Sequence, residues 1–136
     1  MRLSILLAPL AATSTLAMPA PDAATADATI QKRGCFTSGE KWGGDHSNAE
    51  NKAITLCNSL KDSTFSANRN YHKCYNLSSL KKVDFTIKNR NNSSRKLTYA
   101  ECILGTTREI NGCSQGGATD YTNWRFTSVP LPPSDN

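Results

Sequence analysis

Five cysteines, spread between residues 35 and 113, are the feature that most constrains how this chain of 136 residues can fold. None of them forms a C-x-x-C pair, and the chain has only two histidines, so the usual ligand spacing of a zinc site is absent. We therefore expect no metal and no other cofactor, and a secreted disulfide framework. Because five is odd, one thiol stays free or pairs with a second chain, which keeps a homodimer open. The disulfide candidates are Cys35, Cys57, Cys74, Cys102 and Cys113.

One pairing among these cysteines can be argued against. A helix over residues 102–110 rises roughly 1.5 Å per residue, which carries Cys113 past the ~7 Å Cα separation that a disulfide tolerates. Cys102 and Cys113 should therefore belong to different bridges. The sequence leaves every other pairing open.

The N-terminus predicts export. Residues 1–17 place Arg2 before an apolar run and end in small residues, as a secretory signal peptide does, and the run is too short to span a membrane. Residues 18–33 show no periodic apolar pattern and end in the dibasic pair Lys32-Arg33, typical of a propeptide; a simple disordered tail is the alternative. We expect one soluble, extracellular domain over residues 34–136, ending in a proline-rich tail, with no membrane insertion.

The first half of that domain carries a helix signal and a strand signal. Ser47 and Glu50 have capping-box spacing at the start of an amphipathic run, which predicts a helix over residues 47–60. "KKVDFTIKN" alternates apolar and polar residues, which predicts a half-buried strand, and "YHKCYNL" before it is a second strand candidate.

The second half repeats these signals. Thr98 and Glu101 form another capping box, followed by a helix to about Ile110 that we expect to bury Ala100, Ile103, Leu104 and Thr107 as well. "NWRFTSV" predicts a closing strand, and residues 35–38 allow a short one. The expected fold class is α+β: a small, disulfide-stapled single domain whose antiparallel β-sheet is covered by two helices.

Enzymatic and nucleic-acid functions find little support. The net charge is +5, but a ribonuclease would need an acid, a base and a cation together, and His46 and His72 lie in a cap region and on a strand. The acidic residues show no pairing suited to glycoside hydrolysis. We expect no enzyme activity and no nucleic-acid partner.

The richest cluster of recognition chemistry is "GCSQGGATDYTNWRF". Sugar-binding sites stack an aromatic ring on the apolar face of a sugar while amides and carboxylates bond its hydroxyls. Asp120, Tyr121 and Asn123 are the glycan-binding candidates here, and Trp42, beside a glycine turn, is a second candidate platform. A core role is the alternative for Tyr121 and for Trp42.

Three sequons predict N-glycosylation in surface segments. Asn76 lies at a strand end, and Asn91 and Asn92 lie in the polar loop "NRNNSSRK".

The motifs "CFTSGEKWGG", "CYNLSSLKKVDFTI" and "ECILGTTREINGCSQGGATDYTNWRF" resemble, in this order, the fungal secreted Y-three-like glycan-binding domain family, over almost all of residues 35–126. The resemblance implies a secreted fungal lectin-like domain, an αβα-sandwich-like fold with helices on both faces of a sheet, and binding to glycans that contain N-acetylhexosamine. Family members commonly carry a further cysteine after the last strand, where this chain has "SVPLPPSDN", which accounts for the odd count.

Two functions of different class follow. The first is a non-catalytic glycan-binding protein whose partners are glycans or glycoproteins. The alternative is a secreted cysteine-rich effector or toxin that acts through a protein or membrane partner.

Overall fold

The computed structural model describes residues 30–78 and 80–133. The predicted signal peptide and most of the predicted propeptide lie outside this range. Residues 30–33, which we expected to precede the fold, belong to strand β1 (Ile30–Cys35). Whether the chain is cut after Arg33 stays a prediction.

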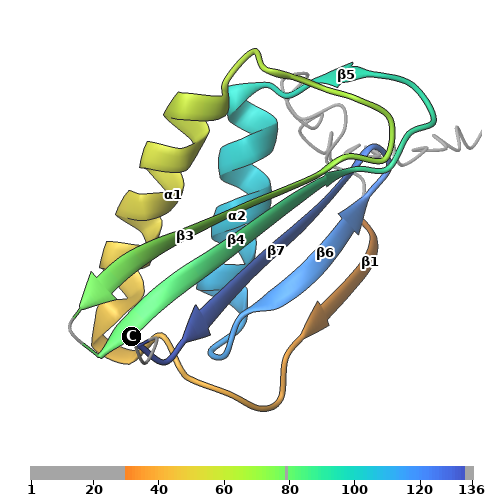
Figure 1. The fold of residues 1–136 in the computed structure, drawn as a ribbon. Coiled ribbons are helices and arrows are strands. Elements are labelled where there is room, and N and C mark those ends of the chain that lie inside the picture. The colour runs from red at the N-terminus through yellow and green to blue at the C-terminus, as the bar shows by residue number, and fades with distance from the viewer. Residues whose placement is uncertain (1–29, 79, 134–136) are drawn as a thin grey trace, which may run out of the picture.

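The described chain forms one antiparallel sheet of five strands in the order β1-β6-β7-β4-β3 (Figure 1). The predicted strands are present as β3 (Asn70–Ser78), β4 (Lys81–Asn89) and β7 (Trp124–Leu131), whereas β6 (Gly117–Tyr121) was not expected. A separate two-stranded ribbon pairs β2 (Thr64–Phe65) with β5 (Arg95–Lys96).

Two helices cover this sheet: α1 (His46–Leu60), which follows the short 3-10 helix η2 (Gly43–Asp45), and α2 (Tyr99–Gly112). They lie side by side on the same face (Figure 1), so the expectation of helices on both faces is wrong for the described residues. The disulfide between Cys57 on α1 and Cys102 on α2 explains the arrangement, because it holds the two helices against each other. The fold is a disulfide-stapled α+β domain with two layers.

The opposite face of the sheet, which we call the open face, carries no helix in the part of the chain that the structure describes. Strand β4 shows the consequence: Val83, Phe85 and Ile87 are fully buried toward the helices, while the residues between them are half-buried. Since successive strand residues point to opposite faces, the alternation assigns every residue of the neighbouring strands to one face or the other.

The two predicted capping boxes had different outcomes. Thr98 and Glu101 form the predicted box, with the Thr98 hydroxyl accepting from the Glu101 amide and the Glu101 carboxylate accepting from the Thr98 amide. The box at Ser47 is wrong, because α1 begins one residue earlier with Asp45 at its N-cap, and Ser47 already lies within the first turn.

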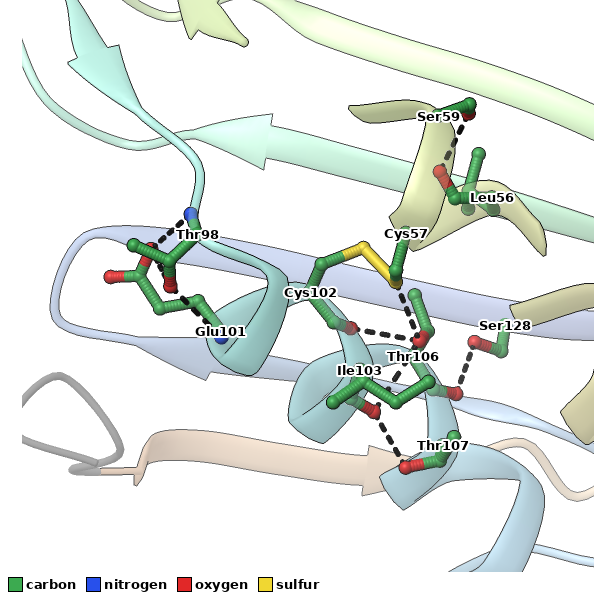
Figure 2. Close-up of a disulfide and its surroundings, with 10 residues drawn as sticks. All are labelled: Leu56, Cys57, Ser59, Thr98, Glu101, Cys102, Ile103, Thr106, Thr107 and Ser128. Carbon is green, nitrogen blue, oxygen red and sulfur yellow. Dashed lines mark hydrogen bonds between the residues drawn. A yellow bond between two sulfur atoms is a disulfide. The ribbon is translucent and has the colours of Figure 1, made fainter. Parts of the chain in front are cut away.

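Helix α2 buries a different face from the one predicted. Thr106, Glu109 and Gly105 are buried, while Ile103 and Leu104 stay half-buried. Figure 2 shows how the helix meets its neighbours: the Thr106 hydroxyl donates to the Cys102 carbonyl at 2.8 Å, and the Thr106 carbonyl accepts from Ser128 on β7 at 2.9 Å. Buried polar groups are tolerated here because they have hydrogen-bond partners.

Gly105 allows α2 to approach the sheet closely. A Cβ at this position would meet the Phe126 ring at 2.1 Å, so only glycine leaves room for that ring. The glycine costs the helix roughly 1 kcal/mol of propensity, and close packing against Phe126 is what it permits.

The second disulfide joins Cys35 on β1 to Cys113 at the end of α2. Cys102 and Cys113 therefore lie in different bridges, as expected. The unpaired cysteine is Cys74, exposed on β3 at an edge of the sheet.

Candidate functional site

Neither predicted aromatic platform offers an exposed ring. Tyr121 is 2% exposed and meets Phe126 edge-on, with ring centroids 5.8 Å apart, and burial raises the pKa of its hydroxyl. Strand β6 ends at Tyr121 and β7 begins at Trp124. The turn between the two strands leaves the rings of Tyr121 and Trp124 both on the helix-covered face. The expectation that Tyr121 is an exposed stacking surface is wrong.

Trp42 is likewise part of the core. It is 2% exposed, and its indole Nε1 donates to the Cys113 carbonyl at 2.8 Å. Its small exposed area lines a hollow of about 420 Å³ near the end of α2, but too little of the ring is exposed for a sugar to stack on it. The expected role of Trp42 as a platform is wrong for the same reason.

Asp120 is the predicted site residue that reaches the open face. It alternates with the buried Thr119 and Tyr121, and its side chain is 13% exposed. Its Oδ1 lies 3.2 Å from Nη1 of Arg125, and its Oδ2 lies 4.0 Å from Nη2 of Arg90. The Oδ1 atom is shielded from solvent and makes no hydrogen bond of good geometry within the described chain, so the ion pair with Arg125 is the contact that holds it.

Asn123 holds the turn beside Asp120 in place through its main chain. Its carbonyl accepts from the Arg90 amide at 2.9 Å and from the Asn91 side chain at 3.4 Å. The Arg90 guanidinium in turn donates to the Tyr121 carbonyl. The structure therefore brings Asp120 and Asn123 to one end of the sheet, with Arg90 connecting the turn to β6.

A hollow of about 270 Å³ lies beside Asp120 on the open face. Its lining comes from β1, β6, β7 and the residue after β1: Gly34, Cys35, Phe36, Ala118, Asp120 and Arg125. Phe36 is 40% exposed, and its backbone amide donates to the Gly116 carbonyl at 2.9 Å, which fixes its position. At Tyr121 we expected a ring beside a carboxylate and an amide; this hollow places the Phe36 ring beside a carboxylate and a guanidinium instead.

A second hollow, of about 250 Å³, lies on the other side of the Asp120–Arg125 pair. It is lined by Asn68, Lys88, Arg90, Asp120 and Arg125. The two hollows share Asp120 and Arg125 and therefore adjoin each other, and we call them together the open-face groove. One end of the groove is aromatic and the other is basic.

Sequence reasoning missed Phe36, Lys88 and Arg90 as site residues. Phe36 had a signal: it is a large apolar residue between a cysteine and the polar stretch "TSGE", with no apolar periodicity that would bury it. The basic residues had none, because nothing local in the sequence brings residues 88, 90 and 125 together.

A buried carboxyl group, that of Glu109, lies on the helix-covered face, away from the groove. Glu109 is fully buried at the end of α2, and this burial raises the pKa of its carboxyl above the ordinary value. The Thr119 hydroxyl donates to it, and the positive charges of Arg33 and Arg108 also oppose the rise. Glu109 lines neither hollow of the open-face groove, so we assign it to the packing of α2 against β6.

The described residues offer neither a metal site nor a membrane span. No three of their His, Cys, Asp or Glu side chains come together in a way that could hold an ion. None of their helices has the length and apolar content to cross a bilayer.

Comparison with known proteins identifies the family. The model described as glycan binding domain Y3 matches residues 50–132. This chain belongs to the Y3 glycan-binding domain family. The match includes Asp120, Lys88 and Arg125 of the groove but not Phe36, and it supports a glycan-binding function.

Other comparisons add little. No curated protein matches the chain. One solved structure that it matches is the tandem DUF26 ectodomain from the Arabidopsis thaliana cysteine-rich receptor-like protein PDLP5, at 16% identity and a TM-score of 0.43. The match covers 76% of this chain and 45% of the other, so this chain spans less than half the length of that protein, and we base no argument on it.

Proposed function

We propose that this chain is a secreted, non-catalytic lectin-like protein of fungal origin that binds N-acetylhexosamine-containing glycans in the open-face groove. The observation that carries the proposal is the exposed Phe36 ring in one hollow with the ion pair of Asp120 and Arg125. Membership of a glycan-binding domain family supports it.

In this proposal each of these groups has a separate role. The Phe36 ring stacks on the apolar face of an amino sugar. Asp120 accepts hydrogen bonds from sugar hydroxyl or acetamido N–H groups, and Arg125 donates to sugar oxygens, each bond contributing roughly 0.5–1.5 kcal/mol net. Because the site is open on one side, we expect a dissociation constant between about 1 mM and 1 μM, or roughly −4.1 to −8.2 kcal/mol.

The groove chemistry also favours binding over turnover. Glycoside hydrolysis uses two carboxyl groups that flank the bond to be cut. Asp120 is the one carboxylate among the described residues that line the groove, and it is already engaged with two guanidinium groups.

A glycan array followed by titration of two variants tests the proposal. Phe36→Ala should weaken binding of the best array ligand about tenfold, equivalent to roughly 1.4 kcal/mol, without loss of fold. Tyr99→Ala is the matched control, because Tyr99 has nearly the same exposure, 38%, but lies at the start of α2 and away from the groove. Equal loss in both variants, or none in Phe36→Ala, would place the site elsewhere.

A secreted effector or toxin is the second candidate, and strand β3 is the observation that favours it. This strand lies at an edge of the sheet and carries the exposed thiol of Cys74. Exposed edge strands can pair with another chain. A wild-type protein that binds no glycan on a broad array would leave this alternative as the better explanation.

A further inference from the structure

The basic end of the open-face groove contains two cations that face each other. Lys88 on β4 and Arg125 on β7 are direct cross-strand partners, and both point to the open face. Like charges directly opposite each other destabilise an antiparallel pair. An arrangement that costs stability in the free protein becomes favourable once an anion lies between the two groups.

The surrounding charges leave this repulsion only partly compensated. Asp120 is ion-paired with Arg125 and approaches Arg90, whereas no carboxylate within the described ranges lies within ion-pair distance of Lys88. The hollow thus holds three cationic side chains and one carboxylate. Asn68, whose backbone amide donates to the Asn91 carbonyl at 3.1 Å, adds a side-chain amide to the same lining.

We propose that this hollow binds the anionic substituent, a carboxylate or a sulfate, of an acidic glycan. The inference rests on the proposed function, because it assigns the neighbouring amino sugar of the same glycan to Phe36. The two hollows share Asp120 and Arg125, so adjacent units of one oligosaccharide can occupy both. Ligand selection would then depend on Lys88, the cation without a carboxylate partner.

Titrations with three matched oligosaccharides test this inference on the full chain: a neutral N-acetylglucosamine-containing glycan, its sulfated form and its sialylated form. At low salt we expect one of the acidic forms to bind about tenfold more tightly than the neutral one, and the two acidic forms show which anion is preferred. Adding sodium chloride should reduce this advantage, because salt screens exposed charges.

Two lysine variants locate the effect. Lys88→Gln should bring the ratio of acidic-glycan to neutral-glycan affinity from about tenfold to within about twofold. Lys82→Gln is the matched control, because Lys82 lies on the same strand and face, opposite Leu131 rather than a cation. Melting curves of both variants verify the fold, and Lys88→Gln should melt no lower than wild type because it relieves the cross-strand repulsion.

Each outcome has a distinct meaning. Equal affinity for neutral and acidic glycans overturns this inference and leaves the proposed function standing. If Lys88→Gln and Lys82→Gln lose the preference equally, the preference comes from general surface charge. If a short single-stranded RNA binds as tightly as the acidic glycan, the hollow is a generic polyanion site. Either result overturns the inference. Failure to bind any glycan refutes the proposed function and this inference with it.

Discussion

Replacing Tyr121 by alanine should damage the fold, not the recognition surface. The ring is 2% exposed and contacts Phe126 edge-on in the core. Removing a buried aromatic side chain costs about 3–5 kcal/mol. For a domain of this size, roughly 1 kcal/mol corresponds to about 4–8 °C in melting temperature, so the variant should melt at least about 12 °C below wild type.

Chemical denaturation and thermal melting of Tyr121→Ala, run beside Phe36→Ala, provide the assay. Phe36 is 40% exposed on the open face, so its variant should melt within about 3 °C of wild type, a loss of less than roughly 0.5 kcal/mol. A Tyr121→Ala protein as stable as wild type would refute the assignment of this ring to the core. If it also lost glycan binding, the original prediction of an exposed platform would be restored.

Three further predictions concern pH, the free thiol and processing. Because burial raises the pKa of Glu109, the folded state holds this proton more tightly than the unfolded state does, and the free energy of unfolding should fall as pH rises above about 4.5. In denaturant titrations, Glu109→Gln should flatten this pH dependence. The control Glu50→Gln, which changes a half-exposed carboxylate, should leave it as in wild type. Denatured but unreduced protein should either react with one equivalent of a thiol reagent or run as a disulfide-linked dimer, and Cys74→Ser should abolish whichever occurs; a clean monomer without a reactive thiol would contradict the free cysteine. Intact-mass analysis should find that the secreted protein begins at Gly34, which would remove residues 30–33 of β1, and a mass that retains the dibasic pair would disprove this processing.

Two local patterns in the sequence predicted their elements correctly. The alternation of Val83, Phe85 and Ile87 predicted β4, and the capping box of Thr98 and Glu101 predicted the start of α2. Both signals depend only on a short stretch of chain. By contrast, β6 begins at Gly117 in a run of small residues, and only pairing with β1 and β7 makes it a strand.

The buried face of α2 shows a second limit of sequence reasoning. Ile103 and Leu104 indicated an apolar face, but the disulfide at Cys102 and the contact of Gly105 with Phe126 fix the helix in another rotation. Thr106 and Glu109 are buried as a result. The Thr119 hydroxyl donates to Glu109, and the Ser128 hydroxyl donates to the Thr106 carbonyl. Such tertiary partners cannot be seen in the helix's own sequence.

The candidate site was predicted in part for a similar reason. Asp120 was identified from its residue type, and the alternation along β6 does bring it to the open face. The same alternation buries Tyr121, and the turn before Trp124 buries that ring as well. The aromatic ring that does accompany Asp120, that of Phe36, lies more than eighty positions earlier in the chain and meets it only through the pairing of β1 with β6.

Mapping of backbone amide chemical shifts during titration with an N-acetylglucosamine-containing glycan tests the central claim most directly. The account predicts that shifts concentrate at residues 34–36, 118–120 and 125, around the aromatic hollow, and that amides of α1 on the opposite side of the sheet stay unchanged. An acidic glycan should extend the shifts to Lys88 and Arg90. Shifts centred on the helices or on edge strand β3, with none around Phe36 and Asp120, would contradict the account.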